Sequence, residues 1–143
     1  MWKGNLIDSI AVKRHVLSGL SSRLKARNNT SKKELGDVLV ISSGISQGEI
    51  GRFKEITEEC EKIAKAISSK GPLNIQCRLS EGKLYVFEIN PRFSGTTSLR
   101  AIAGFNEPDV LIRKYLLKEK VDKINYEEGH ILRGLDEKFF KMG

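Results

Sequence analysis

Residues 73–90 read LNIQCRLSEGKLYVFEIN, and this stretch carries the pattern that decides the fold. Apolar and polar residues alternate in its first half and again in its second half, as expected for two strands that are each buried on one side. The sequence Ser80-Glu81-Gly82 between the two halves is typical of a hairpin turn. The stretch therefore predicts an antiparallel β-hairpin with one apolar face and one polar face.

The length of the turn decides which side chains share a face of this hairpin. A three-residue loop, with Gly82 in the left-handed conformation, places Leu79 opposite Lys83 and gathers the apolar residues of both strands on one face. A two-residue loop would instead bury Gln76 beside Phe87. We therefore predict the three-residue loop.

In that register the polar face carries Gln76, Glu88 and Asn90. A charged carboxylate at the end of a strand of large apolar residues is costly unless a metal, counter-ion or ligand compensates it. Carboxylate and amide oxygens are ligands that Mg²⁺ prefers, and Mg²⁺ usually keeps several waters while it binds substrate phosphates. We predict that these three side chains bind Mg²⁺ or Mn²⁺ together with a nucleotide or an acyl phosphate.

Arg92 follows Asn90 by two residues and is expected to point the same way. Its guanidinium could hold a phosphate or carboxylate through two parallel hydrogen bonds. A second interpretation is that Glu88 and Arg92 pair with each other at the strand end while Asn90-Pro91 makes a turn. The spacing alone leaves both interpretations open.

Helices are predicted on both sides of the hairpin. Apolar residues recur at intervals of three and four over residues 51–69, as on one face of an amphipathic helix. After the hairpin, Ser94 and the residues that follow it are expected to begin a helix, where their hydroxyl and N–H groups could contact an anion or simply cap the helix. Asn106 and Pro108 are typical of the cap and first turn of a further helix.

Further strands are predicted over residues 6–17 and 38–41, with the polar stretch 18–36 between them as a long loop or flap. An edge strand is predicted near residues 130–133. The fold class that follows is α+β, an antiparallel sheet with helices packed on one face. Lys13 and Arg14 on the first strand either reach nucleotide phosphates or form a solvated edge.

Composition limits the class of protein. The chain has 143 residues, of which 39% are hydrophobic and 30% charged, as in an ordinary globular domain. No apolar run approaches the roughly 20 residues of a membrane span, and the N-terminus lacks the layout of a signal peptide. We therefore predict a cytoplasmic protein without a membrane partner.

The net charge of +7 is concentrated near the N-terminus, because residues 1–35 hold eight Lys or Arg and only two acidic residues. Such a basic patch attracts polyanions. Trp2 is the only aromatic residue before Phe53, which argues against a nucleic-acid surface, and a nucleotide triphosphate fits the charge equally well.

Cys60 and Cys77 lie 17 positions apart, without a C-x-x-C spacing or a neighbouring histidine. This argues against a zinc site and against a disulfide framework. We predict that both are small core residues.

The longer pattern resembles a known family. The runs GPLNIQCRL at 71–79 and VFEINPRFSGTTSLRAIAGFNEPDVLIRKYL at 86–116 resemble the C-terminal half of the ATP-grasp domain, specifically its carbamoyl-phosphate-synthase large-chain-like members. GNLIDSIAVKRHVLSGLSSR at 4–23 is similar to the strand and flap that precede that half. The resemblance covers roughly residues 4–117.

The resemblance implies roles for individual residues. The positions of Glu88 and Asn90 would hold the Mg²⁺ that bridges the ATP phosphates, and Gln76 would assist. Arg92 would be catalytic, stabilising the phosphorylated intermediate. Independently of the resemblance, the positions of Lys13, Arg14 and Ser94 along the chain make them further candidates for nucleotide binding. The implied reaction is phosphorylation of a carboxylate or bicarbonate-type substrate by ATP, followed by attack of an amine or other nucleophile on the acyl phosphate.

The chain also departs from the family pattern. An upstream domain and a lid with a glycine-rich loop, a lysine pair and an adenine-binding hinge would precede Met1. We therefore expect a partial ATP-grasp domain over residues 1–120 and an extension over 121–143 packed on it. The missing half would come from another chain or from self-association. The alternative function is a non-catalytic ATP-grasp-derived module or an obligate partner subunit that contacts nucleic acid through the basic N-terminal third.

Overall fold

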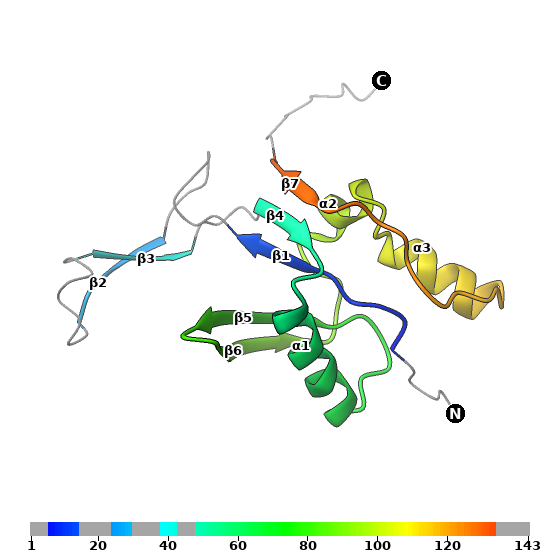
Figure 1. The fold of residues 1–143 in the computed structure, drawn as a ribbon, viewed down its shortest axis with the longest axis horizontal. Helices are drawn as coiled ribbons and strands as arrows, with labels where there is room; N and C mark the ends of the chain where they lie inside the picture. Colours follow the sequence, from blue (N-terminus) through cyan, green and yellow to red (C-terminus); the bar gives the residue numbers. More distant parts are fainter. Residues whose placement is uncertain (1–5, 15–23, 30–37, 43–47, 134–143) are drawn as a thin grey trace, which may run out of the picture.

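The computed structural model describes residues 6–14, 24–29, 38–42 and 48–133. The elements in these ranges are β1 (Ala11–Arg14), β2 (Leu24–Arg27), β3 (Val38–Ser42), β4 (Gly48–Gly51), α1 (Lys54–Ala66), β5 (Asn74–Ser80), β6 (Lys83–Asn90), α2 (Thr97–Ile102), α3 (Glu107–Leu111), the π-helical turn η2 (Ile112–Leu116) and β7 (Gly129–Ile131) (Figure 1). The predicted α+β class with antiparallel strands is confirmed. None of the described helices is both long and apolar enough to cross a membrane.

The described strands form three antiparallel sheets, whereas the sequence predicted one. Their orders are β1-β4-β7, β2-β3 and β5-β6. The predicted edge strand near residue 130 is confirmed as β7, which pairs with β4. β2 lies inside the predicted flap and pairs with β3, because the apolar strand β3 needs a partner for its backbone N–H and C=O groups.

Some predicted segments fall outside the described residues. They include most of the flap, the last part of the strand predicted over 6–17, and the C-terminal end of the predicted extension. The same holds for half of the eight basic residues of the N-terminal patch, namely Lys3, Arg23, Lys32 and Lys33.

The turn between β5 and β6 corrects the predicted register. Ser80 lies opposite Lys83, so the loop has two residues and the predicted three-residue loop is wrong. The loop residues Glu81 and Gly82 both have positive φ, 51° and 72°. Two successive residues with positive φ make a turn whose twist matches that of the flanking strands, which explains why the shorter loop is preferred.

A β-bulge near the middle of the hairpin restores the predicted faces only for residues 74–76 and 88–90. Nearer the turn Arg78 lies opposite Tyr85, so the prediction that the apolar residues of both strands share one face is wrong there. Cys77 is paired with Val86, but the register then shifts and Gln76 is paired with Glu88, which leaves Phe87 as the extra residue. Directly opposed residues of an antiparallel pair share a face. The prediction that Gln76 lies on the face of Glu88 is therefore confirmed, although a bulge rather than the loop length brings it about.

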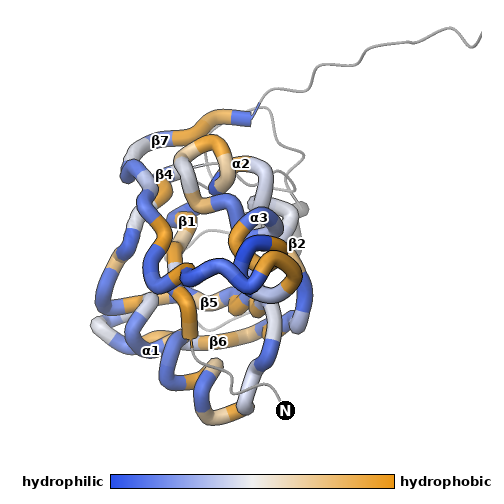
Figure 2. The backbone as a smooth tube through the Cα atoms, turned by 90° about the vertical axis from the view of Figure 1, so that its right-hand side faces the viewer, coloured by the Kyte–Doolittle hydropathy of each residue, from blue (hydrophilic) through white to orange (hydrophobic). Residues whose placement is uncertain are grey.

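Helix α1 lies beside the β5-β6 hairpin (Figure 1). It starts at Lys54, three residues later than predicted, because residues 48–51 form β4 and Phe53 adopts a left-handed conformation with φ of 39°. Apolar and polar residues are interleaved along the helix (Figure 2). Most of its apolar residues are half-buried, and Cys60 on this helix and Cys77 on β5 are half-buried rather than part of the buried core that was predicted for them.

A cluster of buried apolar residues forms the core of the described structure. Phe105, Val110, Val121 and Ile124 form one cluster, against which Ile7, Ile10 and Tyr126 pack. The rings of Phe105 and Tyr126 meet edge to face with centroids 5.5 Å apart. The core thus joins the segment before β1, helix α3 and the segment between η2 and β7.

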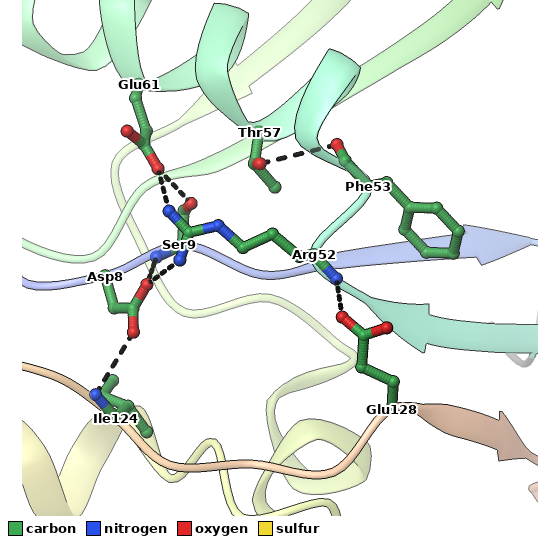
Figure 3. A network of polar contacts seen from close by, with 8 residues as sticks. All are labelled: Asp8, Ser9, Arg52, Phe53, Thr57, Glu61, Ile124 and Glu128. Atoms are coloured by element: carbon green, nitrogen blue, oxygen red, sulfur yellow. Dashed lines mark hydrogen bonds and ion pairs between the residues drawn. The ribbon is translucent and has the colours of Figure 1, made fainter.

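A buried carboxylate, that of Asp8, connects this core to α1 and β4 (Figure 3). Its Oδ1 accepts hydrogen bonds from Ser9 N at 2.8 Å and Arg52 Nη1 at 2.5 Å, and its Oδ2 accepts from Ile124 N at 3.2 Å. Arg52 Nη2 also donates to Glu61 Oε1 on α1 at 3.1 Å. Burial by itself lowers the pKa of Arg52, but the two carboxylates outweigh it and raise that pKa.

We expect Asp8→Asn to lower the free energy of unfolding by about 2–3 kcal/mol, because it removes the charge that compensates Arg52 and one of the buried acceptors. The measurement is urea unfolding followed by circular dichroism. The matched control is Glu59→Gln, which breaks the exposed Glu59–Lys62 pair. The control is expected to leave the free energy of unfolding nearly unchanged, because both side chains of that pair are exposed to solvent. Equal effects of the two substitutions would contradict the role of Asp8.

The turn of the hairpin gives a second prediction. Glu81→Asn is expected to raise the free energy of unfolding by about 0.5–1 kcal/mol, because Asn tolerates positive φ better than Glu. Gly82→Ala is expected to lower it by about 1 kcal/mol through backbone strain alone, since an added Cβ meets no atom within 4 Å. Chemical unfolding of both variants tests the pair, and shifts in the same direction would refute the two-residue turn.

Candidate metal and phosphate site

Three of the predicted site residues meet on the polar face of the hairpin. Glu88 accepts a hydrogen bond at Oε2 from Gln76 Nε2 and one at Oε1 from Asn90 Nδ2, both at 2.6 Å. Glu88 and Asn90 come from β6 and Gln76 from β5. Because the bulge sets Gln76 opposite Glu88, each carboxylate oxygen faces one amide.

This cluster has the donor atoms that a phosphate-bound Mg²⁺ requires. A half-turn of either amide about its last bond presents its oxygen in place of its nitrogen. Two carboxylate and two amide oxygens then form a sparse set of hard ligands, which leaves coordination positions for water and phosphate. Within the described ranges, no three His, Cys, Asp or Glu side chains converge on one point. The oxygen atoms of the Glu88 cluster are of the kind that could hold a metal together with a ligand.

Arg92 lies just past the end of β6. Its backbone N–H donates to Asn90 O at 2.9 Å, and its Nη1 donates to Phe93 O at 2.8 Å. No ion pair joins Arg92 to Glu88, both of which belong to the described residues. The interpretation in which these two side chains only neutralise each other is therefore wrong.

Ser94 forms part of the turn between β6 and α2. Its Oγ accepts a hydrogen bond from Thr96 N at 2.8 Å and lies 2.5 Å from Thr96 Oγ1. The predicted helix after the hairpin is confirmed, since α2 begins at Thr97. The Ser94 hydroxyl thus orders the start of this helix.

Lys13 and Arg14 lie at the end of β1. Lys13 is paired with Glu49 of β4, with 2.9 Å between Nζ and Oε2. On the other side of Glu49, His130 of β7 lies with its Nε2 3.9 Å from Oε1. Lys13, Glu49 and His130 thus lie next to one another across β1, β4 and β7.

An open cavity of ≈ 1230 Å³ brings most of the predicted site residues to a common wall. It is bounded by β1, α1, β5 and the segment between β6 and α2. The predicted residues that line it are Lys13, Arg14, Gln76, Arg92 and Ser94. Glu88 and Asn90 do not line this cavity, and Gln76 connects them to it through its hydrogen bond with Glu88.

A buried ion pair on the same wall was not predicted from the sequence. Arg100 Nη2 donates to Glu107 Oε2 at 2.5 Å and to Thr97 Oγ1 at 3.1 Å. Burial lowers the pKa of Arg100 and raises that of Glu107, and their mutual attraction only partly offsets both shifts. The pair fastens α2 to the first turn of α3 and so supports the segment that carries Arg92.

The sequence contains one indication that Arg100 is buried and paired. Arg100 lies in the run LRAIAGF, in which all the remaining residues are small or apolar. A charged residue inside such a run is buried only if it is paired. The partner could not be identified from spacing, because Glu107 belongs to a different helix.

Curated proteins with similar sequences are carbamoyl phosphate synthase large chains. The chain is 35% identical over 85 residues to that of a Thermoanaerobacter species, 38% over 74 residues to that of Caldanaerobacter subterraneus, and 31% over 86 residues to that of Halobacterium salinarum. These matches cover 59%, 52% and 60% of this chain, but only 8%, 7% and 8% of the respective relatives. No solved structure matches the chain.

The match to a family model is more extensive. Residues 40–137 match the model described as ATP-grasp in the biosynthetic pathway with Ter operon. These residues comprise both strands of the hairpin, the Glu88 cluster and the Arg100–Glu107 pair. The family that the hairpin sequence resembles is therefore confirmed, and the chain belongs to the ATP-grasp family.

Proposed function

We propose that this chain is the Mg-ATP-binding portion of an ATP-dependent carboxylate-amine ligase that acts through an acyl phosphate. The observation that carries the proposal is the cluster in which Gln76 and Asn90 each donate a hydrogen bond to Glu88. Membership in the ATP-grasp family and similarity to carbamoyl phosphate synthase large chains support a ligase-type module.

The proposed reaction has two steps. A carboxylate or bicarbonate oxygen attacks the γ-phosphorus of ATP, and ADP leaves. An amine then attacks the carbonyl carbon of the acyl phosphate, and phosphate leaves. Mg²⁺ held by Gln76, Glu88 and Asn90 would supply the positive charge that the phosphates require. Mn²⁺ has the same preference for oxygen ligands and could replace it.

Arg92 is the proposed catalytic residue. It lines the cavity that Gln76 also lines. Its guanidinium donates a hydrogen bond to the backbone carbonyl of the adjacent Phe93. Exchanging that carbonyl for two phosphate oxygens would strengthen its hydrogen bonding, because charge-assisted bidentate contacts are stronger than a bond to a neutral acceptor. Arg92 would thus stabilise the charge on the transferred phosphoryl group.

The other predicted ligand-binding residues have supporting roles. Lys13 and Arg14 line the same cavity and would add positive charge near the phosphates, with Lys13 leaving Glu49 for the ligand. Ser94 would contact the same anion from the start of α2. In this proposal a further ATP-grasp segment recognises the base and covers the exposed side chains of Tyr85 and Phe87.

The first test is calorimetric titration of the chain with ATP, with and without Mg²⁺. We expect Mg²⁺-dependent binding that Glu88→Gln weakens by about tenfold or more, because the neutral amide removes the charge that holds the metal. Glu81→Gln, on the turn of the same hairpin, is the matched control and is expected to retain wild-type affinity. Mg²⁺-independent binding, or equal affinity of the two variants, would refute the proposal.

A second test separates Arg92 from the metal ligands. Acetyl phosphate is a small acyl phosphate, and we expect it to bind the Mg²⁺-loaded chain. Arg92→Met is expected to weaken this binding by about 10-fold to 100-fold, and Arg92→Lys by less, because Lys keeps the charge but not the two parallel donors. Direct Mn²⁺ titration is expected to give the same metal affinity in all three proteins. If Arg92→Met bound acetyl phosphate as tightly as the wild type, the catalytic role would be wrong.

A further inference from the structure

A buried arginine on the cavity wall has more hydrogen-bond donors than partners. Both side-chain hydrogen bonds of Arg100 come from Nη2, which donates to Glu107 Oε2 and to Thr97 Oγ1. Its Nε–H is buried and has no hydrogen-bond partner among the residues that the structure describes. Since only 9% of the side chain is exposed, bulk water does not supply the missing acceptor.

The unfilled donor indicates an acceptor from outside the chain. A buried donor without an acceptor costs its desolvation free energy, and the cost is higher for a charged group. Such groups are rare in native proteins, and a water, an ion or a ligand usually explains them. The exposed Arg113 shows the ordinary arrangement, since its Nε donates to Glu119 Oε2 at 2.6 Å. Arg100 thus differs from an arginine whose only role is to pair with a neighbouring carboxylate.

The cavity gives an anion access to Arg100. Arg100 and Glu107 line the ≈ 1230 Å³ cavity that Arg92 also lines. The cavity wall carries seven Lys or Arg side chains and four Asp or Glu side chains, a balance of +3. An anion is therefore attracted even though Glu107 already compensates the charge of Arg100. Because Nε lies within the wall, the guanidinium must turn toward the cavity for a ligand to reach it, and Nε loses no hydrogen bond when it does so.

An apolar strip adjoins this ion pair. Glu107, Leu111 and Tyr115 follow one another at intervals of four along α3 and η2, and all three line the cavity. Residues four apart lie on one side of a helix. The half-buried side chains of Leu111 and Tyr115 therefore continue the wall beyond Glu107. A ligand that reaches Arg100 with an acidic group can place an apolar chain along this strip.

We propose that Arg100 anchors a substrate subsite for an organic acid with a short apolar chain. The carboxylate accepts a hydrogen bond from Nε of Arg100, and the chain lies along Leu111 and Tyr115. The assignment to a substrate rests on the proposed function, in which phosphoryl transfer takes place at Arg92. The acid at Arg100 is then a group that does not react, either the carboxylate of the amine-bearing substrate or a second carboxylate of the phosphorylated one.

The test is a titration of the isotope-labelled full chain with isocaproate, without ATP or Mg²⁺, followed through the arginine Nε–H signals in NMR spectra. The Nε–H signal of Arg100 is expected to shift in a saturable way, because it gains an acceptor. The Nε–H signal of Arg113, whose acceptor is already present, is the internal control and is expected to stay in place. Isocaproamide has the same shape but no charge, and it is expected to leave both signals in place.

Two further ligands define what the subsite recognises. Acetate, which lacks the apolar chain, is expected to bind at least about tenfold more weakly than isocaproate. Leucine carries the same chain and carboxylate together with an amine, and it distinguishes the two sources of the carboxylate. Tighter binding than that of isocaproate assigns the carboxylate to the amine-bearing substrate, and weaker binding assigns it to the phosphorylated one.

Arg100→Lys is expected to weaken isocaproate binding by about tenfold, because Lys keeps the charge but lacks the guanidinium donor. The titration of the wild-type chain decides the matter even if this variant does not fold. An Arg100 signal that does not shift with isocaproate, or that shifts equally with isocaproamide, would overturn the subsite. A chain that binds isocaproate but not Mg-ATP would leave the subsite in place and refute the proposed function, so the two failures are distinguishable.

Discussion

The buried carboxylate of Asp8 is the interaction on which the described arrangement depends. Its side chain is only 4% exposed, yet it accepts hydrogen bonds from the end of β4, from its own neighbour and from the segment after η2. A buried charge is tolerated only when its acceptor sites are filled, so these parts must come together or leave the charge uncompensated. Through Arg52 and Glu61 the same network reaches α1.

In the hairpin, the loop length and the placement of Gln76 beside Glu88 are incompatible with regular strand pairing. The positive φ angles of Glu81 and Gly82 fit a two-residue loop, but with regular pairing that loop would set Gln76 opposite Phe87. One extra residue in β6 removes the conflict, because it shifts the register between Gln76 and Cys77. Phe87 is left 67% exposed as a consequence. The bulge therefore determines both the geometry of the Glu88 cluster and an exposed aromatic side chain beside it.

The sequence indicated much of the candidate site because its residues are close along the chain. Glu88, Asn90 and Arg92 alternate along one strand and its exit, and the partner Gln76 belongs to the other strand of the same hairpin. Local alternation is enough to assign such residues to a face. The Arg100–Glu107 pair was missed because its members belong to different helices. Spacing along the chain carries no information on how a helix packs against a strand or against another helix.

The sequence by itself determined the α+β class, the hairpin, the identity of the cluster residues and the family resemblance, because each depends on short-range alternation, turn chemistry and a contiguous motif. Only the tertiary structure decided the division of the strands into three sheets, the hydrogen-bonded partners of Asp8 and the residues that line the common cavity. These features depend on which surfaces pack together, since the burial of apolar area and the compensation of buried charge are properties of the assembled chain rather than of any segment within it.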